Sequence, residues 1–288
     1  MKLSIVIPCL DGAQTIGAQL EALCRQRWPE LWEVIIADSG STDGTAEVIE
    51  RYRQFLPDLR VVDASDRLGS AHARNAGAAV ARGEAILFCD ADDEVGTGWL
   101  AAMGKALRDH DFVASRMDVT KLNPPWISKN MRNAQGSGLQ RVRYSPYLPH
   151  AGGSGLGIKK AIHEMVGGFD ESLPRLMDTD YCFRVQLHGV ELCFVADAVM
   201  HVRYSVNSSS LFRQARLWAE YNVLMYKRYG GHAELPHPWE SYFQTWRDLI
   251  SCAPRMLHKE TRPAWMKTLG TQVGLLQGAI RFRVPPVV

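Results

Sequence analysis

The sequence lacks the features that mark metal-finger, secreted or membrane-spanning proteins. Its six cysteines form no Cys-x-x-Cys pair and lie mostly in apolar runs, which predicts buried, reduced thiols in place of a disulfide framework or a zinc site. It contains no run of about 18 apolar residues, so we expect no membrane-spanning helix. Pro8 and Asp11 interrupt the apolar start of the chain, so we expect no signal peptide. Internal repeats are absent.

Positive charge is scarce in the body of the chain and concentrated in its tail. The 288 residues carry a net charge of only +2. Residues 1–200 hold 21 Lys and Arg against 26 Asp and Glu, whereas residues 201–288 hold 12 against 5. The tail also has 12 of the 26 aromatic residues. It is therefore interpreted separately from the body.

Short apolar runs alternate with helical spacing over the first 120 residues. Strands are expected at 3–7 (ended by Pro8), 34–36, 59–62, 85–89 and from 112, and helices from 16, from 41 (with Ser41 or Thr42 as N-cap), at 71–81 and at 99–107. This alternation predicts an α/β fold with a mostly parallel central sheet flanked by helices. Ligands bind at the C-terminal edge of such sheets, which places the site near residues 8–11, 38–41 and 90–93.

The second half of the chain is less regular. Residues 121–150 show no period, which is typical of a functional or mobile loop. A helix at 178–188 and strands at 191–195 and 198–202 follow, and then helices at 211–229, 239–252 and 262–282. We expect a catalytic domain at 1–205, with a nucleotide half at about 1–115 and an acceptor half at about 116–205. A helical extension is expected at 206–288.

Acidic residues follow two of the expected strands. Asp90, Asp92 and Asp93 come directly after the apolar run 85–89. One acid would bind a sugar hydroxyl and another a Mg²⁺ or Mn²⁺ ion on a diphosphate, since these ions prefer oxygen ligands. The alternative is a solvated turn before a helix. Asp38 after the second strand is either a nucleobase contact or the start of an Asx turn.

Two further features have both a structural and a chemical interpretation. His201 closes an apolar strand, where a histidine is commonly a core residue, although it could complete a metal site. Asp178 and Asp180 open a helix, where acids are favoured by the helix dipole. In the chemical interpretation, one of these two aspartates serves as a general base.

The order of several sequence blocks resembles one enzyme family. The blocks are PCLD, IIADSGSTDGT, GSAHARNAGAAVARGEAILFCDADDE, VGGFDESLPRLMDTDYCFRVQLHG and AVMHVRYS. Over residues 3 to about 205 the chain resembles a family-two glycosyltransferase of bacterial type with the GT-A fold. It departs from the family at Leu10, often an aromatic, at Ser39, usually Asp, and at Met177, usually Glu.

The resemblance implies roles for individual residues. The nucleotide would contact Pro8, Cys9, Leu10, Asp38, Ser39, Arg67, Arg74 and, at the ribose, Asp90. Asp92 and His201 would hold the metal, and Asp178 would be the catalytic base. Arg203, Gly153 and Asp180 are candidates for contact with the diphosphate or the acceptor.

The activity implied is that of an inverting, metal-dependent glycosyltransferase of hexosyltransferase type. It would move a sugar from a nucleotide diphosphate sugar to a hydroxyl of a glycan or lipid-linked acceptor in bacterial surface polysaccharide or glycolipid synthesis. The cofactor would be Mn²⁺ or Mg²⁺. The location would be the cytoplasm, including peripheral attachment to the cytoplasmic face of the inner membrane.

Other functions stay open at this point. Met177 favours a catalytically silent module that binds a nucleotide or glycan. A sugar nucleotidyltransferase would need a basic glycine-rich loop after the first strand, yet no Lys or Arg occurs between Pro8 and Arg25. A Rossmann oxidoreductase would need GxGxxG at that place. The favoured interpretation of the tail is a helical appendage that packs on the sheet. The functional alternative is contact with anionic lipid. The basic residues come with no motif that indicates nucleic acid.

Overall fold

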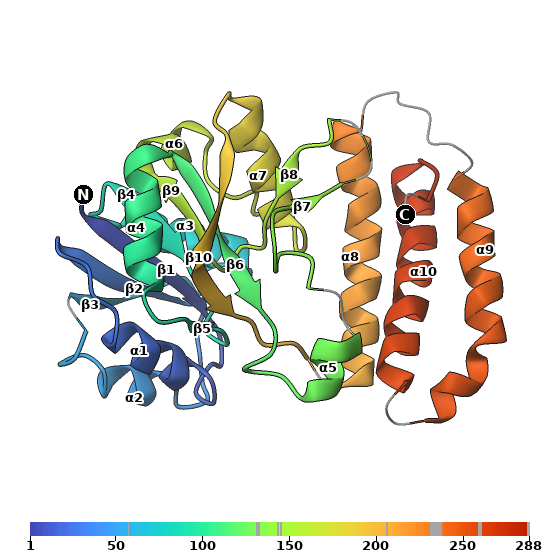
Figure 1. The fold of residues 1–288 in the computed structure, drawn as a ribbon, viewed down its shortest axis with the longest axis horizontal. Helices are drawn as coiled ribbons and strands as arrows, with labels where there is room; N and C mark the ends of the chain where they lie inside the picture. The colour runs from blue at the N-terminus through green and yellow to red at the C-terminus, as the bar shows by residue number, and fades with distance from the viewer. Residues whose placement is uncertain are drawn as a thin grey trace. The chain divides into compact units, whose positions relative to one another are not determined.

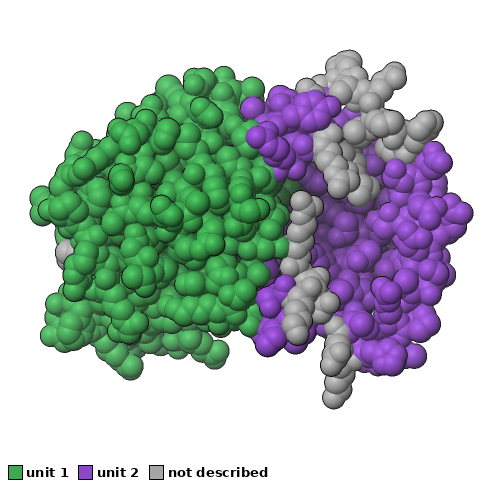
Figure 2. Space-filling model, in the orientation of Figure 1, with its two compact units in different colours: residues 1–123, 133–140, 149–203 green, residues 124–132, 141–148, 204–288 purple. Residues whose placement is uncertain are grey.

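The computed structural model describes residues 1–56, 58–130, 133–142, 144, 146–205, 207–230, 238–258 and 261–286. The chain forms two compact units (Figures 1 and 2). Unit 1 comprises residues 1–123, 133–140 and 149–203, and unit 2 comprises 124–132, 141–148 and 204–288. Parts of the aperiodic stretch 121–150 thus belong to unit 2.

Unit 1 is built on an eight-stranded sheet in the order β3-β2-β1-β4-β9-β6-β10-β5. The strands are β1 (Leu3–Cys9), β2 (Trp32–Asp38), β3 (Leu59–Asp63), β4 (Ala85–Phe88), β5 (Glu94–Val95), β6 (Phe112–Asp118), β9 (Leu156–Lys159) and β10 (Leu192–His201). Strands β1 to β4 run parallel to one another, and β6 runs parallel to β10. Only β9 and β5 run antiparallel to the strands beside them. The mostly parallel α/β sheet is therefore confirmed.

Helices cover both faces of this sheet (Figure 1). They are α1 (Ile16–Cys24), α2 (Thr45–Glu50), α3 (Ser70–Ala79), α4 (Trp99–Asp109), α6 (Lys160–Met165) and α7 (Met177–Leu187). One core cluster packs α1 and α4 on the sheet, and a second packs α3 and α7 on it. The strands in between carry almost continuous buried runs, as strands covered on both sides do.

Three local expectations were wrong. The second helix begins at Thr45, not at Ser41, because Gly44 enters it at φ +91° while the Ser41 hydroxyl bonds Asp38. Strand β1 continues through Pro8, which lies beyond the last residue of β1 paired with β4, so its missing N–H costs no bond on that side. The two strands expected at 191–202 are one strand, β10, with an irregularity between Val195 and Val199.

The last part of the chain in unit 2 is helical. It contains α8 (Ser208–Tyr229), α9 (Pro238–Ser251), the 3₁₀ helix η1 (Ala253–Leu257) and α10 (Arg262–Phe282), and the earlier segment adds α5 (Pro125–Asn130). Apart from the main sheet, β7 (Gln140–Arg141) pairs with β8 (Pro149–His150).

Helices α8 and α10 run parallel in close contact along a row of glycines. A Cβ at Gly270, Gly274 or Gly278 would lie 2.0–2.7 Å from a backbone oxygen of α8. The face of α10 that carries these glycines has no side chains there, so the two backbones can approach closely. Beside this α8–α10 seam, Arg281 pairs with Glu220 at 2.7 Å. Helix α9 runs antiparallel to α10, where the Tyr242 hydroxyl donates to the Gln272 carbonyl at 3.3 Å. None of the described helices has both the length and the apolar character needed to cross a bilayer.

Candidate active site

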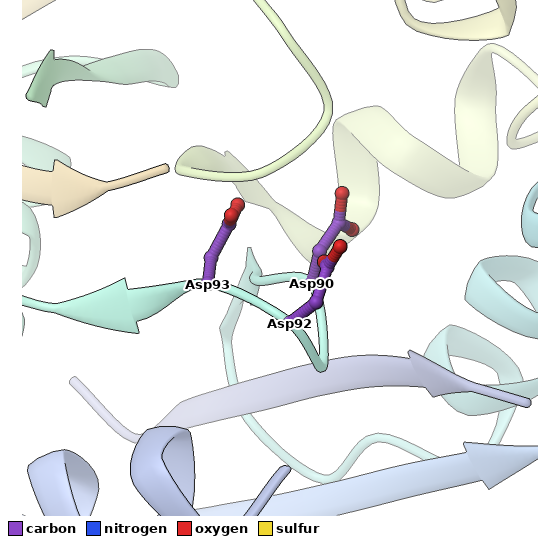
Figure 3. Close-up of side chains that lie close together, drawn as sticks. All are labelled: Asp90, Asp92 and Asp93. Atoms are coloured by element: carbon purple, nitrogen blue, oxygen red, sulfur yellow. The ribbon is translucent and has the colours of Figure 1, made fainter. Parts of the chain in front are cut away.

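Three aspartates meet in the turn after β4. The carboxylates of Asp90, Asp92 and Asp93 have oxygen atoms within 4.8 Å of one another, and they point to the same side of the turn (Figure 3). The turn lies at the C-terminal edge of the sheet, where the strand order predicts a ligand. Among the described residues this is the group of acids, histidines and cysteines that is arranged to hold a metal ion.

Crowding and burial disfavour charge on this cluster. Burial first, and then the neighbouring Asp90, raise the pKa of Asp92. Burial together with both neighbouring carboxylates raises the pKa of Asp93 well above its usual range. A divalent cation would remove that repulsion, and three carboxylates are the hard oxygen donors that Mg²⁺ and Mn²⁺ prefer. The donor set therefore fits the expected ion.

A buried glutamine of α1 holds this acidic turn in place. The Gln19 amide donates to the Asp90 carbonyl at 3.3 Å, and its oxygen accepts the Val95 N–H at 2.9 Å. Gln26, which follows the end of α1, bonds the Gly96 carbonyl and the Leu100 N–H in the same way. Both side chains are buried, so α1 and the residues just after it fix the backbone on both sides of residue 96.

Arg74 connects the acidic turn to the expected base. Its buried guanidinium pairs with the Asp90 carboxylate. Gly153 lies against the same guanidinium, since a Cβ there would be 3.0 Å from Arg74 Nη2. The Gly153 N–H donates to Asp178 Oδ2 at 3.0 Å. Segments around residues 74, 90, 153 and 178 are thus brought together by direct contacts, although Asp90 and Asp178 lie far apart in the sequence.

Asp178, in the first turn of α7, has a carboxylate held by two hydrogen bonds. Its Oδ1 accepts the Thr179 N–H at 2.8 Å while its Oδ2 accepts the Gly153 N–H. His150 lies near this carboxylate; burial lowers the pKa of its imidazole and the charge of Asp178 raises it, with a net decrease. Met177, in place of the usual Glu, is partly buried against the core cluster of α3 and α7.

Arg203 reaches the acidic turn, whereas His201 takes another partner. The Arg203 N–H donates to Asp93 Oδ1 at 2.9 Å, and its side-chain Nε donates to the Asp92 carbonyl at 3.1 Å. His201 Nδ1 lies 2.7 Å from Asp118 Oδ2 and is not part of the three-aspartate group. Metal binding by His201 stays a prediction.

The residues expected to contact the nucleobase lie on two interlocked loops. Asp38 accepts the Ser41 hydroxyl at 2.5 Å, which is the Asx-type turn left open by the sequence. Asp11 joins the loops, donating its N–H to Ser41 and accepting from Thr42. The Ser39 N–H bonds the Cys9 carbonyl at 2.9 Å, and burial raises the pKa of the Cys9 thiol to about 11.

Exposure differs among the residues of the first loop. Leu10 is half exposed, and Pro8 is partly buried. Leu10 thus offers an exposed apolar side chain in place of the usual aromatic ring, and its contact with a base stays a prediction.

Two predicted contact residues have structural partners. Arg67 donates to Glu171 at 2.8 Å on the surface. Asp180 is fully buried, and its carboxylate pairs with Arg184 at 2.8 Å. Arg184 also donates to the Val166 and Gly168 carbonyls, so Asp180 helps to fix the loop before α7. The predicted ligand contacts of Arg67 and Asp180 stay predictions.

Some residues of the site were not predicted from the sequence. Ser154 accepts the Asp90 N–H at 3.2 Å and lowers the pKa of Asp93 by hydrogen bonding. Gln19 stands at an apolar position of the α1 stripe, three residues after Ile16, and Gln26 continues that spacing three residues after Leu23, just past the end of the helix. A polar residue at an apolar position of a helix is the sequence signal that could have predicted these buried hydrogen bonds.

Comparison with known proteins identifies the family of the chain. The model of the family described as "Glycosyl transferase family 2" matches residues 4–167, more than half of the chain. The uncharacterized glycosyltransferase YibD of Escherichia coli is 36% identical over 126 residues, covering 43% of this chain and 34% of the relative. YwdF of Bacillus subtilis is 28% identical over 64% of this chain and 68% of the relative.

A further relative has an acceptor in its name. The poly(ribitol-phosphate) beta-glucosyltransferase of Bacillus spizizenii is 35% identical over 34% of this chain and 16% of its own length. The chain thus spans about a third or less of the length of two of these three relatives.

Solved structures share the fold. The mannosyltransferase PcManGT of Pyrobaculum calidifontis, in complex with GDP-Man and Mn²⁺, superposes with a TM-score of 0.67 at 21% identity, covering 96% of this chain and 86% of that one. Staphylococcus aureus TarS 1–349 with UDP gives 0.56 at 18% identity, covering 98% and 92%. The expected GT-A fold is confirmed.

Proposed function

We propose that this chain, which belongs to glycosyl transferase family 2, is a glycosyltransferase that moves a sugar from a nucleotide diphosphate sugar to an acceptor hydroxyl. The observation that carries the proposal is the contact series Asp90–Arg74–Gly153–Asp178, which holds an acidic turn and a separate carboxylate around one edge of the sheet. Transfer needs both: an anchor for the diphosphate and a proton acceptor beside the sugar.

The acidic turn would anchor the donor. Asp92 and Asp93 would hold Mn²⁺ or Mg²⁺, which when bound would stabilise the negative charge of the leaving diphosphate. Asp90, fixed by Arg74, would accept a hydrogen bond from the ribose. Arg203 extends from Asp92 and Asp93, so its guanidinium would add positive charge to the same diphosphate. The base would lie on the loops of Asp38 and Leu10.

Asp178 would act as the base. Two N–H groups fix its carboxylate, so each oxygen retains a lone pair for the acceptor hydroxyl. It would take the hydroxyl proton as the oxygen attacks the anomeric carbon, while the bond to the diphosphate breaks on the opposite face. A single displacement of this kind inverts the configuration of that carbon.

The solved neighbours suggest which donors to test. TarS is solved with UDP and with UDP-GlcNAc, and PcManGT with GDP-Man and Mn²⁺. We propose a glycan or lipid-linked acceptor, in bacterial surface polysaccharide or glycolipid synthesis, and a cytoplasmic location. A nucleotide-binding module without activity is the second candidate, because Met177 replaces an acid beside the proposed base.

Asp178→Asn tests the proposal. Asparagine can still accept the Gly153 N–H but cannot take a proton, so transfer should fall by about 10²–10⁴-fold while nucleotide binding is kept. Release of nucleoside diphosphate from UDP-GlcNAc, UDP-glucose and GDP-mannose, with and without Mn²⁺, reports turnover, and calorimetry reports binding. Asp109→Asn, at the exposed end of α4, is the matched control. Binding without release by the unaltered protein would favour the silent module.

A further inference from the structure

Helix α9 and the following turn expose an unusual number of large apolar side chains. Five of them fall within one helix and one short turn: Trp239 (44% exposed), Phe243 (59%), Ile250 (67%), Met256 (42%) and Leu257 (74%). In the described part of the chain, the exposed large apolar residues are densest in this segment. Because uncovered apolar surface is costly in water, such a patch indicates a partner.

The exposed residues of α9 form one stripe. At about 100° per residue, Trp239, Phe243 and Ile250 fall within a narrow arc of the helix. The neighbouring arc holds Tyr242 and Leu249, which are buried in unit 2. The apolar face of α9 is therefore wider than the part that its own unit covers. Trp239 and Phe243 also stack, with ring centroids 6.1 Å apart.

A basic residue flanks the stripe. Arg247 is four residues after Phe243 and three before Ile250, so it lies beside both on the helix surface. Glu240 lies on the same flank, and Asp248 lies opposite the stripe. Arg255 in η1 and Arg262 at the start of α10 add exposed positive charge next to Met256 and Leu257.

Charge is strongly divided between the two units. The residues of unit 2 include 15 Lys and Arg against 5 Asp and Glu, a net charge of +10, whereas unit 1 has 18 against 26, a net charge of −8. The unit that carries the apolar stripe is thus the one that an anionic surface attracts.

We propose that the surface formed by Trp239, Phe243, Arg247, Ile250 and the η1 residues Met256 and Leu257 docks on a bilayer that contains anionic lipid. Aromatic and aliphatic side chains would enter the acyl boundary, and the arginines would reach the headgroups. A nucleic acid would use the positive charge but would leave the apolar stripe in water. A protein groove is the competing occupant of a single helix stripe, and the net charge of +10 on unit 2 favours the anionic bilayer over it. The proposal goes beyond sugar transfer and does not depend on it.

Vesicle co-sedimentation tests this surface. The unaltered protein should bind vesicles of phosphatidylcholine with phosphatidylglycerol, and should bind pure phosphatidylcholine at least about tenfold more weakly. Raised salt should release it. Phe243→Ser with Ile250→Ser should weaken binding by about tenfold or more, because each buried apolar side chain contributes separately. Arg247→Gln with Arg255→Gln should have a similar effect on anionic vesicles only.

Matched controls separate this surface from general stickiness. Leu31→Ser removes an equally exposed leucine from unit 1 and should leave vesicle binding unchanged. Absence of vesicle binding by the unaltered protein would overturn the proposal, as would equal binding to neutral vesicles. A dimer in light scattering that Phe243→Ser dissociates would also overturn it, because a second copy would then cover the stripe. Folding of each variant is checked by circular dichroism, and nucleotide release is measured separately.

Discussion

The side-chain amide nitrogen of Gln19 lies 3.3 Å from the carbonyl oxygen of Asp90, across a sequence separation of 71 residues. The side-chain oxygen of Gln19 accepts the Val95 N–H. One buried side chain of α1 therefore spans the acidic turn from its first residue to β5. The carboxylates of that turn repel one another, and their arrangement therefore depends on a backbone that cannot relax.

Replacing Gln19 should damage cation binding. Gln19→Met keeps the length of the side chain but leaves the Asp90 carbonyl and the Val95 N–H without a partner, at about 1–3 kcal/mol each. We expect lower stability and a Mn²⁺ affinity reduced by about tenfold, measured by calorimetry or by the thermal shift on adding Mn²⁺. Gln14→Met, at an exposed position just before α1, should change neither quantity. Unchanged Mn²⁺ affinity in Gln19→Met would show that the turn holds its shape without this bridge.

A methyl group at Gly153 should uncouple the two halves of the site. The Cβ of Gly153→Ala would lie 3.0–3.5 Å from three atoms of the Arg74 guanidinium, which is buried and paired with Asp90. Either Arg74 or the 152–154 backbone must move. Arg74 holds the Asp90 carboxylate and the Gly153 N–H holds the Asp178 carboxylate, so either movement displaces a carboxylate of the site. Turnover should fall about tenfold or more, because small displacements at a reacting centre are costly. Gly138→Ala meets no atom within 4 Å and should leave nucleotide release unchanged. A normal rate in Gly153→Ala would contradict this coupling.

The sequence predicted the site where spacing and strand ends determine it. Asp90, Asp92 and Asp93 follow a buried strand, so their place at the sheet edge required only the alternation of elements. Contacts such as Gly153 with Asp178 depend on how loops from separate elements pack, which no local pattern encodes. The partner of His201 was missed for the same reason: Asp118 lies 83 residues away, at the end of the adjacent strand β6.

The tail shows another limit of pattern-based prediction. The boundaries of α10 were predicted correctly, because its caps and period are local. The glycines within it gave no usable signal, since their purpose appears only when α8 lies against them.

A surface network near α3 should make stability depend on pH. His72 places Nδ1 3.0 Å from Glu171 and Nε2 2.8 Å from Asp66, so both nitrogens can donate only when the ring is protonated. The hydrogen bond to Asp66, together with Glu171, raises the pKa of His72 despite some desolvation. The resulting stabilisation is complete below the unfolded-state pKa, about 6.5, and is lost as pH rises through the higher folded value.

His72→Gln tests that dependence. The variant should be less stable than the unaltered protein at acidic pH, and the difference should shrink as the pH rises past the folded pKa of His72. The network is close to solvent, so the effect should be modest. Urea unfolding across pH measures it, and His258→Gln, at an exposed histidine after η1, is the control. A difference that grows toward alkaline pH would contradict the assignment of a protonated ring.

The parallel seam of α8 and α10 should not accept a side chain at Gly274. Alanine is favoured over glycine inside a helix by about 1 kcal/mol, so an open position would gain stability from the change. A Cβ at Gly274 would lie 2.0 Å from the Arg216 carbonyl oxygen and 2.8 Å from its carbon, and backbone atoms cannot turn away as a side chain does. Overpacking of this kind costs about 1–3 kcal/mol, so the clash should win and Gly274→Ala should lower the free energy of unfolding. Chemical denaturation measures this change, with Thr268→Ala on the exposed side of α10 as the control. If Gly274→Ala were as stable as Thr268→Ala, the two backbones would not be in the close contact described.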